Sequence, residues 1–584
     1  MNCRLIARFL GIVSILIGVS MLFSLLWAMP QFGGVWENEA SGVRGLLISS
    51  LISCLLGKFF FWFGKKNTNL QLLRRESLAV VGLSWILAAF LGALPYLISG
   101  SESSLGVPMS FADAIFESQS GFSTTGASVI NDVENPLVLP RTILFWRCTT
   151  HFLGGLGIMV LFVVILGQGS TGKAIMRIEK GAGSESNPIA KMRQLAIGLL
   201  RVYLGLNGIM ILILVLLNVS WFDAICLSFS TIATGGFSTF NSSIGHFAAN
   251  TTLNSGLIET VIIFFMICAG TNFSLLYLFA IGQPLKLFRD TEWRTYIGIL
   301  IIATILIFVS GIYWNDFDIY GTSDKPMISI PDTVSIKQNQ ETIVPLQESQ
   351  SGNSVSVSTE SHPLESSESQ PIENQLVEVT KYKIPWHIAL RKVVFSVASI
   401  MTSTGFCVDE QDSWNSLSLF IITILMFVGG CAGSTAGGIK VIRSIIMFKT
   451  FGQEIEKSYR PNVIRTLKLD GQNVDRSVQT GILIFILFFA VSIALFTVFI
   501  LMIEPNTQWT SRGLSYSEKL IDVSAATLSS FANTGVSLGV AGARSNFSGF
   551  SDLSKLILSI AMFLGRLELY VGFVLILPSF WKKH

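Results

Sequence analysis

Long apolar runs alternate with short polar linkers along most of this chain. Ten runs approach or exceed the roughly 20 residues that a membrane-crossing helix needs, and they lie at 8–28, 44–63, 78–99, 140–167, 195–218, 256–282, 294–313, 416–447, 478–504 and 553–580. No small-residue cleavage site follows the first run, so we interpret it as a membrane helix and not as a signal peptide. The pattern predicts an all-α polytopic membrane protein.

Four shorter segments between these runs share one pattern of residues. Each has an anchor glycine, a serine six positions before it and a small polar residue two positions before it. The anchors are Gly126, Gly236, Gly405 and Gly535, the serines Ser120, Ser230, Ser399 and Ser529, and the polar residues Thr124, Thr234, Ser403 and Asn533. Such a match, four times over, indicates an internal repeat. Each segment is too short to cross the bilayer. We therefore expect it to enter and leave on one side, where protein or a water-filled cavity surrounds it.

An acidic residue stands thirteen positions before the anchor in three copies, at Asp113, Asp223 and Asp522, whereas the third copy has Lys392. We expect these acids near the start of a half-helix, where a carboxylate complements the positive end of the helix dipole. The negative ends of four half-helices then converge and attract a cation without any buried carboxylate. The sequence therefore predicts a cation-selective pore, and Lys392 is expected to weaken the negative charge at its mouth.

The residues around the anchors are the candidate ion ligands. Glycine tolerates positive φ, which lets successive backbone carbonyls point one way and replace the hydration shell of an ion, as carbonyl rings do for K+ in tetrameric channels. We call the four segments the filter turns; they comprise Thr124, Thr125, Gly126 and Ala127; Thr234, Gly235, Gly236 and Phe237; Ser403, Thr404, Gly405 and Phe406; and Asn533, Thr534, Gly535 and Val536. None has the Thr-Val-Gly-Tyr-Gly run of highly selective channels, so we expect weaker discrimination between K+ and Na+.

Composition and charge placement agree with this topology. Only 13% of the residues are charged, about half the share in soluble proteins. Lys and Arg gather in alternate linkers and at both ends, so the positive-inside rule predicts cytoplasmic termini. The opposite side carries an insert, 314–383, that is rich in Ser, Gln and Glu and is expected to be loosely ordered. The cysteines and histidines lack metal-ligand spacing. No paired carboxylates and no nucleophile with a base indicate an enzyme.

Several motifs resemble one known family. The filter turns, Gly429–Lys440 (GGCAGSTAGGIK), Met562–Tyr570 (MFLGRLELY) and Trp146–Ile158 (WRCTTHFLGGLGI) are similar to the membrane subunit of Trk/Ktr-type bacterial potassium uptake systems. Two helices ahead of the repeats resemble the Trk branch. The resulting domains are a two-helix region, 1–76, followed by four pseudo-fourfold helix–pore loop–helix repeats, as in potassium channels, at 77–193, 194–292, 293–475 and 476–584.

The resemblance implies K+ uptake across the bacterial inner membrane, a homodimer, and a cytosolic regulatory partner that binds nucleotide. This chain has no Rossmann fingerprint, so we expect no nucleotide on it, no cofactor other than the transported K+, and no nucleic acid. Two alternatives remain: a K+ symporter coupled to H+ or Na+, and a weakly selective K+/Na+ channel. Coupling usually needs intramembrane acids, and the sequence offers few candidates beyond Glu568.

The segment 429–440, which we call the intramembrane loop, lies inside the eighth apolar run. Each glycine in a helix interior costs about 1 kcal/mol relative to alanine, so the sequence predicts a break here. Close helix packing through small residues at four-residue spacing and a kinked helix are the alternatives. The resemblance implies a gate below the filter, with candidate residues Gly429, Gly430, Gly433, Ser434, Thr435, Gly437, Gly438 and Lys440.

Arg566 is the remaining candidate gate residue. An Arg in mid-membrane costs several kcal/mol unless it faces water or a partner. We hypothesise that Arg566 projects into the conduction path below the filter and raises the barrier to cations. A structural pair with Glu568 is the alternative.

Overall fold

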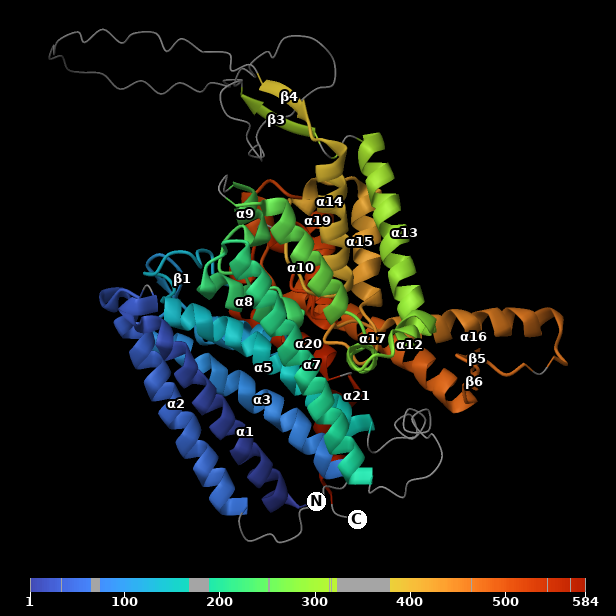
Figure 1. Ribbon diagram of the computed structural model, residues 1–584, viewed down its shortest axis with the longest axis horizontal. Helices are drawn as coiled ribbons and strands as arrows, with labels where there is room; N and C mark the ends of the chain where they lie inside the picture. Colours follow the sequence, from blue (N-terminus) through green and yellow to red (C-terminus); the bar gives the residue numbers. More distant parts are fainter. Residues whose placement is uncertain are drawn as a thin grey trace, which may run out of the picture.

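The computed structural model describes residues 2–32, 34–64, 74–166, 188–249, 253–314, 316, 318–322, 379–463, 465–543, 545–567 and 569–582 (Figure 1). The molecule is a bundle of helices, and the two ends of the described chain lie at the same end of that bundle. Most of the predicted insert 314–383, the linker residues Lys65, Lys66, Lys173, Arg177 and Lys180, and Glu568 lie outside the described residues.

The first two helices form an outer pair, α1 (Cys3–Ser24, continued by η1, Leu25–Ala28) and α2 (Trp36–Gly64). Small residues bring their backbones together: a Cβ placed on Gly11 would lie 2.7 Å from the carbonyl oxygen of Gly57. Close approach of this kind is how helices associate in lipid, where burial of apolar surface gives little driving force.

The rest of the chain repeats one order of elements four times: a long helix, a half-helix and a second helix. The bounds are α3 (Arg74–Ser99), α4 (Phe111–Phe122) and α5 (Arg141–Leu166); α7 (Pro188–Leu216), α8 (Trp221–Ile232) and α10 (Ser255–Ala269); α13 (Thr291–Trp314), α14 (Trp386–Met401) and α15 (Ser416–Val428); and α17 (Arg476–Ile503), α19 (Tyr516–Ala532) and α20 (Asp552–Arg566). This order agrees with the predicted repeat, whose domain boundaries stay a prediction.

The remaining elements lie within, between and after the repeats. The helices are α9 (His246–Ala249), α11 (Phe273–Ala280), α12 (Pro284–Arg289), α16 (Val441–Tyr459), α18 (Thr507–Ser511), α21 (Tyr570–Ile576) and α22 (Pro578–Trp581), with single turns at Pro30–Phe32, Ser243–Gly245, Gln411–Ser413, Gly539–Ala541 and Phe547–Gly549. Three antiparallel hairpins are formed by β1 (Glu102–Ser104) and β2 (Val107–Pro108), β3 (Asp318–Thr322) and β4 (Val379–Lys383), and β5 (Lys468–Leu469) and β6 (Gln472–Asn473).

The predicted spans are helical, but three of them are not single helices. Within the described residues, six helices are long and apolar enough to cross a membrane alone, and two bent pairs raise the number to eight. The runs 256–282 and 553–580, which the sequence predicts as one crossing each, are such pairs, bent by 106° and 119°. The third, 416–447, is interrupted between α15 and α16. Asn272 explains the first bend, because its side chain accepts a hydrogen bond from Ser274 N and starts α11 anew.

The hydrophobic core lies mainly where one repeat packs on the next. One buried cluster joins the first repeat to the fourth and includes Phe116, Trp146, Trp509 and Phe547. A second joins the second repeat to the third through Phe395 and Phe406. The half-helices therefore stand inside a shell of long helices, and their C-terminal ends meet in the interior.

The half-helices begin as predicted in two copies only. Asp113 is the third residue of α4 and completes a capping box with Ser110. Asp223 is the third residue of α8, and its N–H donates to the side chain of Ser220, the capping residue of that helix. In the fourth copy the prediction is wrong, because α19 has 17 residues against 12 in α4. The acid that caps α19 is Glu518. Asp522, thirteen positions before Gly535, lies one turn further into the helix.

The third copy differs in the same way. Its half-helix α14 has 16 residues, so Lys392 falls in the second turn and not at the N-terminus. Its ammonium group lies 2.9 Å from Asp409 Oδ2. Because that carboxylate neutralises it, Lys392 weakens the negative charge of the mouth less than the sequence predicts.

Candidate functional site

The four filter turns have the same backbone conformation. Each half-helix ends at a residue with positive φ that is not glycine: Thr124 (49°), Thr234 (53°), Ser403 (53°) and Asn533 (53°). The next residue then donates its N–H to the carbonyl of the repeat's serine, from Thr125 to Ser120 (2.9 Å), Gly235 to Ser230 (2.7 Å), Thr404 to Ser399 (2.8 Å) and Thr534 to Ser529 (3.0 Å). This is the usual left-handed ending of a helix, and it turns the chain sharply at the same point in every copy.

The four anchor glycines close a ring. A Cβ placed on Gly126 would lie 2.0 Å from Gly235 O, one on Gly236 2.1 Å from Thr404 O, one on Gly405 2.0 Å from Thr534 O, and one on Gly535 2.1 Å from Thr125 O. Each turn therefore contacts the next in the order first, second, third, fourth and back to the first. All four anchors also have positive φ, between 78° and 86°. Only glycine meets both demands.

The side chains beside the anchors are buried in protein, and three of the anchor glycines are more accessible than these neighbours. The neighbours Thr125, Phe237, Thr404 and Thr534 are buried, whereas Gly126, Gly236 and Gly405 keep accessible surface. Gly535 is buried, so the fourth quarter is the least accessible. An opening lined by backbone presents carbonyl oxygens, which are the ligands that dehydrated alkali cations prefer.

A buried ion pair braces the first two turns from behind. Arg147 Nε on α5 lies 2.5 Å from Glu117 Oε1 on α4, and both side chains are almost fully buried. Glu117 also accepts the Val129 N–H at 3.0 Å, and Arg147 donates to Ser238 O at 3.1 Å. The guanidinium stacks on Phe237 at 3.4 Å, and His151 stacks on the same ring at 4.1 Å.

The sequence prediction missed both residues of this pair. It expected the ends of the half-helices to attract a cation without any buried carboxylate, and it named few acids within the membrane. The first expectation is wrong, because Glu117, Glu259 and Glu292 are all buried. The sequence carries a signal for both, because Glu117 is a second acid in the middle of the half-helix, beyond the capping residue Asp113, and Arg147 stands in an apolar run. Intramembrane charges of this kind usually have a partner.

We expect Arg147→Gln to destabilise the protein by about 3–5 kcal/mol, since removing one member leaves the Glu117 carboxylate buried without its cation. Thermal unfolding in detergent measures the loss. The double variant Glu117→Gln with Arg147→Gln removes both charges and should recover part of the stability. A double variant less stable than Arg147→Gln alone would contradict this interpretation.

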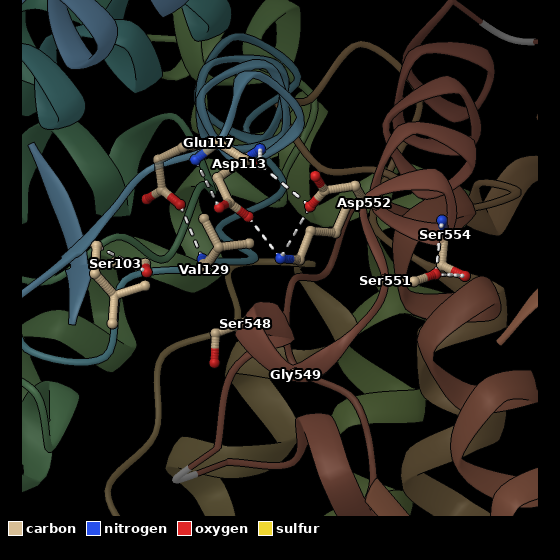
Figure 2. Close-up of polar contacts among 12 residues, drawn as sticks. Ser103, Asp113, Glu117, Val129, Ser548, Gly549, Ser551, Asp552 and Ser554 are labelled. Carbon is tan, nitrogen blue, oxygen red and sulfur yellow. Dashed lines mark hydrogen bonds and ion pairs between the residues drawn. The ribbon is translucent and has the colours of Figure 1, made fainter. Parts of the chain in front are cut away.

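A second buried pair fastens the first half-helix to the last repeat. Lys555 Nζ on α20 lies 2.6 Å from Asp113 Oδ1 at the start of α4, and the Ser110 hydroxyl donates to Asp552 Oδ1 at 3.1 Å. Figure 2 shows Asp113 and Asp552 approaching from these two helices. Because the first and fourth repeats are far apart in sequence, this contact helps to close the ring.

Two acids, Asp409 and Asp412, lie in the loop between α14 and α15. Asp409 pairs with Lys392. Burial, together with the neighbouring carboxylates of Asp522 and Glu410, raises the pKa of Asp412 to about 6. Asp412 is therefore still mostly ionised at pH 7 and adds negative charge to this loop.

The intramembrane loop is irregular backbone, as predicted. Helix α15 ends at Val428 and α16 begins at Val441, so the alternatives of helix packing through small residues and of a kinked helix are wrong for this segment. Gly429, Gly433, Gly438 and Lys440 have positive φ. A Cβ on Gly437 would lie 1.9 Å from Ala532 O, at the end of the fourth half-helix. The glycines thus allow tight turns and close approach.

Two hydrogen bonds place this loop against the ends of the half-helices. Gly437 N donates to the Ser403 hydroxyl at 2.5 Å, and the Thr435 hydroxyl donates to Ile232 O at 3.0 Å. Ser403 belongs to the third filter turn, and Ile232 ends the second half-helix. The loop therefore lies directly behind the ring, on the side of the half-helix C-termini. Lys440 contacts the loop itself, since its ammonium group donates to Ala436 O.

Arg566 reaches the same loop. It ends α20, is 4% exposed, and donates from Nη1 to Thr435 O at 2.8 Å. Its Nε and Nη2 atoms have no hydrogen-bond partner within the described part of the chain. The alternative pairing partner, Glu568, lies outside the described residues.

Comparisons with known proteins show what this chain is similar to. A family model described as "TrkH: Cation transport protein" matches residues 47–583. The chain is 28% identical to the Trk system potassium uptake protein TrkH of Halomonas elongata over the full length of both chains. It is 27% identical to the Trk system potassium uptake protein TrkG of Escherichia coli K12 over 96% of each. A crystal structure of the potassium transporter TrkH from Vibrio parahaemolyticus superposes over the whole of both chains with a TM-score of 0.73 at 25% identity. This chain belongs to the TrkH family of cation transport proteins.

Proposed function

We propose that this protein is the pore-forming subunit of a Trk-type potassium uptake system, and that K+ crosses the membrane through the ring of the four filter turns. The observation that carries the proposal is the closed order of contacts from Gly126 through Gly236 and Gly405 to Gly535. A ring of this kind holds a cation by backbone oxygen without a resident carboxylate. The names of the curated relatives support K+ as the transported ion.

In the proposed mechanism the filter turns are Thr124–Ala127, Thr234–Phe237, Ser403–Phe406 and Asn533–Val536. K+ exchanges water for their carbonyls, while the negative ends of α4, α8, α14 and α19 stabilise its charge. The intramembrane loop and Arg566 then form the gate behind the ring. We propose further a homodimer in the bacterial inner membrane with cytoplasmic termini. A cytosolic nucleotide-binding subunit regulates the gate.

The buried carboxylates favour a gated pore over a coupled symporter. Glu117 is paired with Arg147, Glu259 lies 2.6 Å from Arg391, and Glu292 accepts two backbone N–H groups. A carboxylate held in place by such partners is not free to pass a proton from one side of the membrane to the other in each transport cycle. A symporter would need a carboxylate that exchanges protons with both sides.

Bilayer recordings of the purified protein test this proposal. We expect K+ and Rb+ currents larger than Na+ and Li+ currents, with a preference smaller than that of channels with the Thr-Val-Gly-Tyr-Gly filter. The reversal potential should follow the K+ gradient and ignore a pH or Na+ gradient. A reversal potential that moves with pH would favour coupling to H+, and equal K+ and Na+ currents would favour a non-selective channel.

A further inference from the structure

Glu292 is a buried carboxylate that the proposed pore does not use. It is the second residue of α13 and 6% exposed. One of its oxygens, Oε1, accepts two backbone hydrogen bonds, from Ala432 N at 2.7 Å and from Ile442 N at 3.1 Å. No Lys or Arg of the described chain forms an ion pair with it. Its charge is therefore balanced mainly by these N–H groups.

The two donors belong to opposite ends of the intramembrane loop. Ala432 lies near its beginning, and Ile442 is the second residue of α16, just after its end. Helix α16 has no side-chain cap of its own, because its capping position is Lys440. Glu292 fills that role from another helix, because its oxygen accepts the N–H of Ile442, the second residue of α16, as a capping side chain does.

This contact ties the loop to another helix. Three backbone hydrogen bonds already join the two ends of the loop to each other, among them the bond from Lys440 N to Val428 O at 3.0 Å. The other loop N–H groups need acceptors as well, because irregular backbone at membrane depth has no water to bond. Glu292 fastens the joined ends of the loop to the start of α13 through one atom. Releasing it frees both ends from α13 together.

We propose that Glu292 is the positioning residue that holds the intramembrane loop in its blocking conformation. This rests on the proposed function of the loop as a gate. A neighbouring contact could transmit regulation of the gate to Glu292. The hydroxyl of Thr291, next to Glu292, donates to Asp470 in the turn between β5 and β6. That hairpin stands beside α16 and the start of α17 (Figure 1). A partner that moves it acts on the start of α13 and loosens the Glu292 contact.

The test is K+ flux into proteoliposomes that contain the Glu292→Ala variant without any partner. Loss of two hydrogen bonds to a charged acceptor should raise the basal flux about tenfold. The ratio of K+ to Na+ flux should stay at the parent's value, because the filter turns are untouched. Glu292→Gln keeps an acceptor oxygen and should return most of the block. Thr304→Ala is the control: the Thr304 hydroxyl lies further along α13, donates to Leu300 O at 2.8 Å, and its loss should leave the flux unchanged.

A second measurement does not depend on transport. Cys431 lies in the loop and is 1% exposed. If Glu292 holds the loop, Glu292→Ala should increase the rate at which a maleimide labels Cys431 about tenfold, as followed by mass spectrometry. Cys148 and Cys226, buried in the helix packing, should not change.

The outcomes separate the two proposals. A Glu292→Ala variant with the parent's flux and the parent's Cys431 labelling overturns the role of Glu292. So does a variant in which the K+ to Na+ flux ratio changes and the labelling of Cys148 and Cys226 also rises, because the whole protein is then loosened. A parent protein that carries no K+ overturns the proposed function. In that case the Cys431 labelling still decides whether Glu292 holds the loop.

Discussion

Replacing Gly126 with alanine is expected to lower K+ uptake by about tenfold or more, because the new methyl group displaces a backbone carbonyl of the ring and a cost of about 1.4 kcal/mol corresponds to a factor of ten. An L-residue with φ of 86° is strained, and the new Cβ would lie 2.0 Å from the carbonyl oxygen of Gly235. That carbonyl belongs to the neighbouring filter turn, so relieving the clash displaces a proposed ion ligand. Rb+ uptake into proteoliposomes, with K+ and Na+ as competitors, measures both the rate and the selectivity.

Gly106→Ala supplies a matched control. Gly106 has φ of 81°, in the turn between β1 and β2, and a Cβ there would meet nothing within 4 Å. It carries similar backbone strain without a clash in the ring, so its uptake should equal the parent's. Equal losses in the two variants would mean that strain, and not the displaced carbonyl, explains the result. Full uptake by Gly126→Ala would reject the ring as the ion path.

The repeat itself could be predicted because its constraints are local. In each copy, a residue with positive φ is followed two positions later by a glycine with positive φ, as at Thr124 and Gly126. This conformation restricts the residue types at both positions, so it can be recognised in the sequence. The same holds for the break at 429–440, where glycine density opposes helix formation. Local backbone chemistry of this kind is encoded within a few residues and therefore survives in the pattern.

Partners that come from distant parts of the chain could not be predicted. Glu117 and Arg147 stand 30 positions apart, and Glu292 is 140 positions from Ala432. Neither periodicity nor spacing carries such a contact. The starts of α14 and α19 were missed for a different reason: only the end of a half-helix is fixed by the ring, so its length varies between copies and the capping residue moves with it.

Arg566→Ala is expected to increase K+ conduction about tenfold, the factor that follows from removing one positive charge roughly 10 Å from a cation at an effective dielectric constant near 20. The guanidinium is buried behind the ring and bonds to Thr435 O in the intramembrane loop. Its Nε and Nη2 atoms have no partner within the described part of the chain. Removing it therefore leaves no carboxylate unpaired there, and the protein should stay folded. Single-channel conductance and the open fraction are read from the same bilayer recordings.

Arg566→Lys separates the two ways in which this residue can act. Lysine keeps the positive charge but loses the planar fork that reaches Thr435 O. If the charge is the barrier, the Lys variant conducts like the parent and only Ala conducts faster. If the hydrogen bond holds the loop, both variants increase the open fraction, and Arg566→Ala combined with Glu292→Ala should add little to either alone, because both changes release the same loop. An Arg566→Ala variant that conducts no faster than the parent contradicts both roles and leaves the loop backbone alone as the gate.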